Sequence, residues 1–411
     1  MKTPGTVPSR RQFLSLAAGA AAGAVTGRLR AGTQAPAAGP VSPGPGPRRG
    51  GPTAFIHTTD LFRPHFDPDD HWDLATSYAL ASRGDLEILG ILADNPRNLE
   101  LLPELSKDMD AYVDAGVHHA RSPDVAAVAQ MNYLTDRAVP VATGTIWPGT
   151  PGERVRADHL PPELRGVHLL LDLLRTSPRP VAILIGGSCQ DVAVAGMKEP
   201  GLFSEKCAGI YLTAGVGSPD PKDQRFDLGV EWNVNLNPGA YAAIFELPCP
   251  IYWMPCHNNL HAVGVGGFGT YWTFRYQEVV PQLAARMQAY VACVLSRESG
   301  TDWLSYLLDP KSPSAVQKFL GETKAMWSTA GFVHAAGRVV TVDGDLVSQG
   351  ASGGRDAYEF LPIQVRCDSD GITSWEPART PTNRYIFRVT DRDRYACAML
   401  RAFKTLLLEL S

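Results

Sequence analysis

Short apolar runs and longer amphipathic runs alternate along most of the chain after residue 52. The short runs predict buried strands, and the runs with apolar residues every three or four positions predict helices. The predicted strands are Ala54–Thr59, Leu86–Ala93, Val181–Ile185, Ala208–Leu212 and Ile251–Met254. The predicted helices are His71–Ser82, Val167–Leu174, Asp191–Met197 and Pro238–Phe245. This alternation predicts an α/β fold with a mainly parallel central sheet flanked by helices, a Rossmann-like core.

The last third of the chain has a different pattern. It is predicted to be mostly helical over residues 276–329, with one helix at Glu278–Leu295. Three strands and a closing amphipathic helix follow, at Arg338–Val342, Phe360–Arg366, Tyr385–Val389 and Asp391–Leu410. Residues 104–165 are harder to interpret and are expected to hold a helix and a long loop over the site.

Residues 1–52 contain no pattern that predicts a fold. The sequence SRRQFL at residues 9–14 opens an apolar run of small residues, which is too short to span a bilayer comfortably. SRRQFL resembles the twin-arginine signal, which directs folded proteins across the bacterial inner membrane. We therefore predict a twin-arginine signal peptide at 1–38, a Pro/Gly linker at 39–52 and one domain at 53–411. The mature protein is predicted to be periplasmic or secreted, and to meet the membrane only transiently through this signal.

Composition narrows the possible partners. The net charge is −4 and no basic stripe is present, so nucleic acid is not an expected partner. The seven cysteines lie in apolar segments without CxxC spacing, which argues against a zinc site. Their odd number leaves at least one free thiol in a monomer, and one disulfide is compatible with export.

Five aspartates crowd the junction between the first predicted strand and the first predicted helix. Asp60 ends the strand, and the others follow at Asp67, Asp69, Asp70 and Asp73. One or two such residues would indicate a helix N-cap and a solvated loop. Five carboxylates repel one another unless a cation or several donors neutralise them. The cluster therefore predicts a site for a hard cation or for sugar hydroxyls, beyond the carboxyl ends of parallel strands.

This cluster and four later segments resemble the inosine–uridine nucleoside hydrolases, from about Ala54 to the C-terminus. The family signature DxDPGxDD is matched by Asp60 and by Asp69-Asp70, with five extra residues between them; another register uses Asp67-Pro68 as the DP step. The later matches, in family order, are Gly90–Asn95, Ile185–Ala193, Glu231–Pro238 and Phe387–Asp393. In the third of these, Asn237 replaces the aspartate of ExNxxxDP. Five ordered matches are far more specific than one.

The resemblance implies a nucleoside-hydrolase-like fold and a calcium-dependent hydrolase of N-glycosidic bonds in nucleosides or related ribosyl compounds. A metal-activated water would attack the sugar C1′. Calcium would be held by Asp60, Asp70 and the Gly186 carbonyl, and Asp60 would also take the water's proton. The sugar would be bound by Asp69, Asn95, Glu231 and Asn233. Without the resemblance, Glu231 and Asn233 indicate only a capped turn. Relatives are commonly homodimers or homotetramers, so either state is possible here.

The general acid for the leaving base is assigned by the resemblance to His334, since a histidine titrates near operating pH. The alternative is a buried structural histidine on a helix. His257 is a second candidate, and Arg63 and His65 lie in the insertion of the aspartate cluster. Bulky aromatic residues indicate either stacking surfaces or core: Phe62, Phe66, Trp72 and Trp232.

The chain departs from the family pattern in two places. Ala335 follows His334 where the family has a calcium-binding aspartate, and Arg225 replaces an expected asparagine. Losing a carboxylate weakens calcium binding, and we expect Asp67 or Asp73 to compensate. A catalytically weakened relative that binds a nucleoside or sugar is therefore the alternative function. A metal-dependent phosphoesterase is a third hypothesis, but its expected His/Asp partner ligands are not evident.

Overall fold

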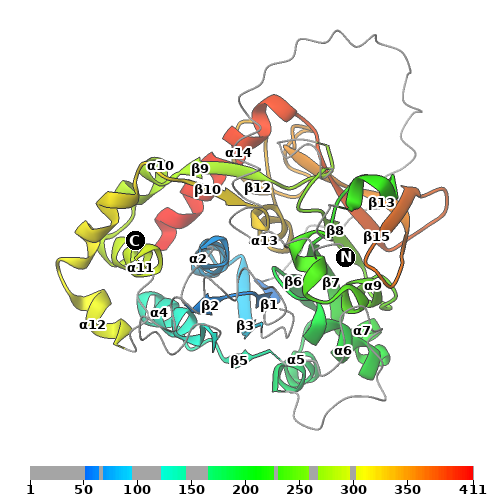
Figure 1. Cartoon of the computed structure of the whole chain (residues 1–411), viewed down its shortest axis with the longest axis horizontal. Coiled ribbons are helices and arrows are strands. Elements are labelled where there is room, and N and C mark those ends of the chain that lie inside the picture. The colour runs from blue at the N-terminus through cyan, green and yellow to red at the C-terminus, as the bar shows by residue number, and fades with distance from the viewer. Residues whose placement is uncertain are drawn as a thin grey trace, which may run out of the picture.

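The computed structural model describes residues 51–63, 68–94, 122–144, 165–225, 230–258, 267–296 and 302–410. A nine-stranded sheet forms its centre, in the order β14-β13-β15-β8-β7-β6-β1-β3-β5 (Figure 1). Its strands are β1 (Thr53–Thr59), β3 (Leu86–Ala93), β5 (Val141–Thr143), β6 (Val181–Ile185), β7 (Cys207–Thr213), β8 (Ile251–Met254), β13 (Tyr358–Cys367), β14 (Thr373–Pro377) and β15 (Arg384–Val389). The seven strands from β5 to β15 are parallel, whereas β13 and β14 are antiparallel. The predicted fold class is confirmed.

The order of the strands reverses beside β1. The chain adds β3 and β5 on one side of β1, and then returns to add β6, β7 and β8 on the other side. The connections that leave β1 and β6 therefore diverge at the carboxyl ends of these two strands. Such a reversal opens a crevice where open α/β sheets bind their ligands. Asp60 follows β1 and Gly186-Gly187 follows β6, so both segments lie at this crevice.

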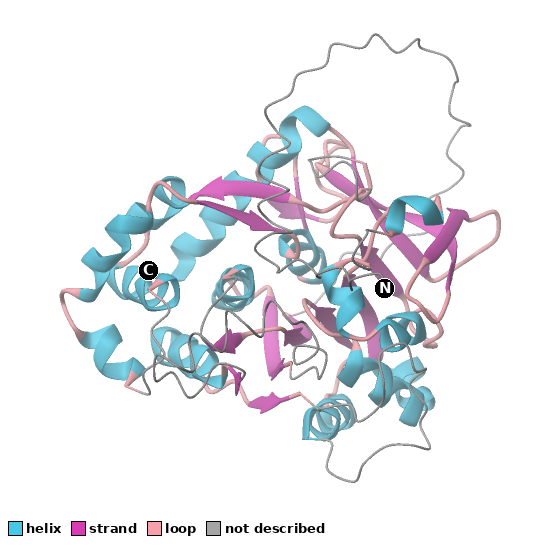
Figure 2. Ribbon diagram, viewed as in Figure 1, coloured by secondary structure: helices cyan, strands magenta, loops and turns pink. Residues whose placement is uncertain are grey.

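Helices cover both faces of the sheet (Figure 2). Phe55 of β1 faces a core built with α2 (Asp69–Ser82), α13 (Thr329–Ala335) and α14 (Arg392–Leu407). Its neighbour Ile56 faces the opposite core, which contains α5 (Arg165–Thr176), α6 (Gln190–Lys198) and α9 (Pro238–Ile244). Because both faces are buried, the central strands are continuous apolar runs, and this is why the sequence predicts them well.

The predicted helix Glu278–Leu295 is wrong in its first third. The segment forms α10 (Tyr276–Val279), a 3-10 turn (Val280–Gln282) and then α11 (Ala285–Leu295). Pro281 explains the break, because proline has no backbone N–H and its ring clashes with the carbonyl four residues earlier in a helix.

The region predicted to be mostly helical also contains strands. It is bounded by an antiparallel pair, β9 (Trp272–Arg275) and β10 (Thr323–Met326), which lies outside the central sheet (Figure 1). Likewise β11 (Arg338–Val340) pairs with β12 (Leu346–Ser348) in a separate small sheet. The remaining elements are β2 (Phe62–Arg63), β4 (Ser122–Pro123), α4 (Val125–Thr135), α7 (Pro200–Lys206), α8 (Trp232–Leu236), α12 (Trp303–Leu308) and 3-10 turns at Pro221–Gln224, Ser312–Phe319 and Leu408–Leu410. Within the described ranges, no helix is both long and apolar enough to cross a bilayer.

The buried His57 on β1 should make the stability of the folded protein depend on pH. Its ring is fully buried, meets Phe332 edge-on at 4.9 Å, and has no hydrogen-bond partner in the described part of the chain. Burial lowers the pKa of His57 from 6.5 to about 3, because it disfavours the charged imidazolium. Below pH 6.5 the unfolded chain binds a proton at His57 that the folded protein does not bind. The free energy of unfolding is therefore highest above pH 6.5 and falls as the pH falls towards 3. Between pH 7.5 and 5 the loss from this residue is about 2 kcal/mol.

We expect His57→Leu to remove this part of the acid sensitivity. Urea unfolding at pH 7.5 and pH 5 measures it, as the difference in the free energy of unfolding between the two conditions. His168→Leu, at an exposed position of α5, is the matched control. An unchanged pH dependence in His57→Leu would contradict the assignment.

Candidate active site

The ends of three neighbouring strands meet at Asp60. Asp60 follows β1, Asp94 follows β3 and Gly187 follows β6, and both aspartates are at least 97% buried. A Cβ at Gly187 would lie only 2.8 Å from Cβ of Asp60 and 2.9 Å from its backbone nitrogen. The close approach of these strands therefore requires glycine at this position.

Asp70 joins the same group from the first turn of α2. Its Oδ1 accepts a hydrogen bond of 2.6 Å from the Thr59 hydroxyl, and a Cβ at Gly186 would lie 3.5 Å from this oxygen. Asp69 and Asp70 both lie in this first turn, where the helix dipole favours negative charge. The structure thus brings together the three residues predicted to bind metal: Asp60, Asp70 and Gly186.

Two further buried carboxylates have raised pKa values. Burial, together with the charges of Asp191 and Asp60, raises the pKa of Asp94 well above its ordinary value, although the Ser188 amide donates to it. Burial raises the pKa of Asp73 to about 7, opposed by a hydrogen bond from Ser328 and by the charge of Lys324. Asp94 lies in the matched segment Gly90–Asn95, but no role of its own was assigned to it from the sequence.

The segment at α8 combines a capped turn with contacts to the site. The Glu231 carboxylate accepts from the backbone amides of Gly215, Asn233 and Val234 at 2.7, 3.1 and 3.3 Å. Burial raises its pKa, and these three bonds oppose the rise. Trp232 Nε1 donates to Asp60 Oδ2 at 3.4 Å. The predicted turn is therefore present, and it also delivers side chains to the ends of β1 and β6.

The Asn233 side chain connects the carboxyl ends of β6 and β7. Its Nδ2 donates to the carbonyl oxygens of Thr213 at 2.9 Å and of Gly186 at 3.4 Å. It therefore contacts the carbonyl that was predicted as a metal ligand.

Lys324 was missed by the sequence analysis. It lies on β10 and is 5% exposed, and its Nζ is 3.4 Å from Oδ1 of Asp69. The same Nζ lies 5.8 Å from the centre of the Trp327 ring. The local signal was weak, because Lys324 lies between Thr323 and Ala325, and the region was predicted to be helical, where a lysine is expected to be solvated.

His334 lies in the last turn of α13, within an aromatic cluster. Its Nδ1 is 2.9 Å from the Tyr211 hydroxyl, and its ring packs against Tyr252 and Phe360. This enclosure lowers the pKa of His334 to about 3. The described contacts of His334 match its structural interpretation and do not join it to Asp60.

The opposite end of α13 approaches the aspartates, through Ser328. Ala335 is buried in the apolar core at the far end of the helix. His257, the second candidate acid, follows β8, and its ring centre is 6.3 Å from that of Trp327. Burial lowers the pKa of His257 to about 4.

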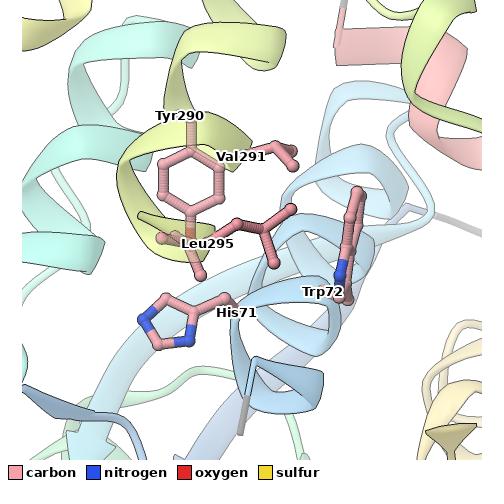
Figure 3. Close-up of a pocket in the computed structure, with 6 residues that line it drawn as sticks. His71, Trp72, Tyr290, Val291 and Leu295 are labelled. Atoms are coloured by element: carbon pink, nitrogen blue, oxygen red, sulfur yellow. The ribbon is translucent and has the colours of Figure 1, made fainter. Parts of the chain in front are cut away.

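Trp72 is a core residue and not a stacking surface for a ligand. Its ring packs against Phe274, Tyr276 and Phe403. Figure 3 shows that it lines a narrow cavity between α2 and α11, which contains none of the predicted site residues. The lining residues are His71, Trp72, Tyr290, Val291, Val294 and Leu295. Several residues named from the sequence lie outside the described part of the chain: Asn95, His65, Phe66, Asp67 and the side chain of Arg63.

The described donors do not make a calcium cage. Calcium takes six to eight oxygen ligands, whereas Asp60, Asp70 and Gly186 offer two carboxylates and one carbonyl. In the ranges that the structure describes, no three His, Cys, Asp or Glu side chains are placed to hold a metal. In particular, Asp73 does not complete a three-carboxylate group with Asp60 and Asp70 as the sequence led us to expect.

Comparisons with known proteins find similarity at the level of structure. No protein-family model matches the chain, and no curated protein matches it. The chain is similar in structure to three solved proteins, among others. They are an inosine–uridine preferring nucleoside hydrolase from Bacillus anthracis, a purine-preferring ribonucleoside hydrolase from Gardnerella vaginalis and a plant nucleoside hydrolase. Their identities to this chain are 13, 14 and 14%, and their TM-scores are 0.41, 0.43 and 0.44. The matches cover 86, 87 and 86% of this chain, and 99% of each of the three structures.

Proposed function

We propose that the protein hydrolyses the N-glycosidic bond of nucleosides or related ribosyl compounds. One observation carries the proposal. Asp60, Asp70 and Gly186 meet at the strand-order reversal beside β1, and Trp232 and Asn233 reach the same place from α8. Of these residues, the motifs assign Asp60 to the attack on the sugar, Asp70 and Gly186 to the metal, and Asn233 to sugar binding.

The proposed reaction needs one base and one acid. A water oxygen attacks C1′ of the sugar while Asp60 accepts its proton, and the electrons of the C1′–N bond leave with the base. Asp69 would bind the ribose hydroxyls. Glu231 holds the turn that carries Asn233, through bonds to three backbone amides. No acid is assigned to the leaving base, because burial lowers the pKa of His257 to about 4 and that of His334 to about 3, so both rings are neutral at pH 7.

Several finer features remain predictions from the sequence. They are export through the twin-arginine signal to the periplasm or beyond, assembly into a homodimer or homotetramer, and calcium as cofactor. Because the described donors fall short of a calcium shell, no step is assigned to the ion. In the described part of the chain, which includes all seven cysteines, no disulfide is formed.

A panel of purine and pyrimidine ribonucleosides tests the proposed function. We expect release of free base and reducing sugar from at least one member, measured by chromatography and a reducing-sugar assay. The panel is run in calcium and in EDTA, so that turnover and metal dependence are separate results. Saturable binding of a nucleoside without turnover would favour the weakened, binding-only alternative, whose basis is the loss of the usual residues at Ala335 and Arg225.

A further inference from the structure

A buried lysine carries positive charge into the aspartate cluster. Moving an ammonium group out of water is strongly unfavourable unless an anion compensates it. Lys324 has such a partner, because its Nζ lies 3.4 Å from Oδ1 of Asp69 and both residues are buried. Its charge also reaches Asp73 and Tyr271, where it opposes the rise in pKa that burial causes.

Lys324 comes from outside the Rossmann-like core. It is held on β10, which pairs with β9 from Thr323 to Met326. The segment that follows it carries Trp327, whose ring the ammonium approaches at 5.8 Å, and Ser328, which bonds Asp73. The geometry thus fixes the ammonium between the first turn of α2 and the start of α13.

We propose that the ε-ammonium of Lys324 is the resident cation of the aspartate cluster, and that it positions Asp69 for the sugar diol without a requirement for calcium. This inference rests on the proposed function for the identity of the ligand. The positive charge of Lys324 compensates Asp69, while the position predicted to supply a metal-binding carboxylate is Ala335, buried elsewhere. A lysine ammonium has three donors, so it is able to bond both Asp69 and a diol oxygen held by Asp69.

Calcium binding measured by calorimetry tests the charge assignment without any assay of activity. We expect no saturable binding of calcium to the full-length wild-type protein. We expect Lys324→Met to gain saturable calcium binding, because a repelling positive charge has been removed. Lys324→Arg keeps the charge and should behave as wild type, as should Lys311→Met at an exposed position.

Thermal unfolding of the wild-type protein gives a test that needs no variant to fold. We expect the same Tm in EDTA and in calcium, since an ion that does not bind cannot stabilise the folded state. A rise of Tm in calcium, or tight calcium binding that Lys324→Met does not improve, would overturn the inference.

Kinetics separates this inference from the proposed function. For a ribonucleoside that the wild type hydrolyses in EDTA, we expect Lys324→Met to raise KM about tenfold or more and Lys324→Arg to restore most of the loss. Turnover that EDTA abolishes and calcium restores would overturn the inference but leave the proposed function intact. No turnover on any nucleoside would overturn the proposed function, while the calcium-binding result still decides whether Lys324 is the cation.

Discussion

Asp60→Asn is expected to lower the rate of ribonucleoside hydrolysis by about 10²–10⁴-fold, the usual contribution of a general base. Asp60 follows β1, where its Cβ and backbone nitrogen approach Gly187 and its carboxylate accepts from Trp232 Nε1. Asparagine has the same shape and keeps one oxygen for the tryptophan, but it cannot take a proton from water. The loss should therefore appear in kcat, with little change in KM.

Steady-state kinetics on the best nucleoside of the panel measures this effect, and circular dichroism verifies that the variant is folded. Asp172→Asn is the matched control, because Asp172 is exposed on α5 and forms an ion pair with Arg175. If Asp60→Asn kept more than half of the wild-type kcat, Asp60 would not be the base.

Glu231→Ala is expected to lower the free energy of unfolding by about 3–5 kcal/mol, because it leaves buried donors unsatisfied. The Glu231 carboxylate accepts from three backbone amides, of Gly215, Asn233 and Val234, and the residue is 4% exposed. Alanine offers no acceptor, and buried N–H groups without partners are strongly unfavourable. The Asn233 side chain should move with the turn.

Urea unfolding at pH 7.5 measures this loss. Glu231→Gln keeps one acceptor oxygen and should fall between alanine and wild type, which separates the hydrogen bonds from the charge. Glu205→Ala, at an exposed position of α7, should change stability by less than about 0.5 kcal/mol. A loss below about 1 kcal/mol in Glu231→Ala would show that the turn at α8 does not depend on this carboxylate.

The parts of the fold predicted correctly are those with a strong local signal. β1 and β6 are short, continuous apolar runs because helices cover both of their faces, and both were predicted from this pattern. The three-residue β5 at the edge of the sheet gave no such signal. The error at Glu278–Leu295 came from treating apolar periodicity as decisive where Pro281 breaks the helix.

The site was predicted as far as sequence neighbours define it. Asp60, Asp70, Glu231 and Asn233 each follow a strand or begin a helix, so their positions follow from the element beside them. The assignment of His334 as the general acid depended on which end of the short helix α13 faces the aspartates. Sequence spacing does not contain that information. Lys324 depended on a contact across 255 positions of the chain, which only the tertiary structure reveals.

The pair of strands β9 and β10 has a consequence for the order in which the protein matures. The aspartates that need a counter-charge are encoded within the first quarter of the chain, whereas the ammonium that meets them is encoded in its last quarter. A partly made or partly folded chain therefore holds a self-repelling cluster of acids at the edge of its sheet. Asp69 gains the charge of Lys324 only when the late segment docks on α2, so a competent site is also a sign that the chain has folded as far as β10.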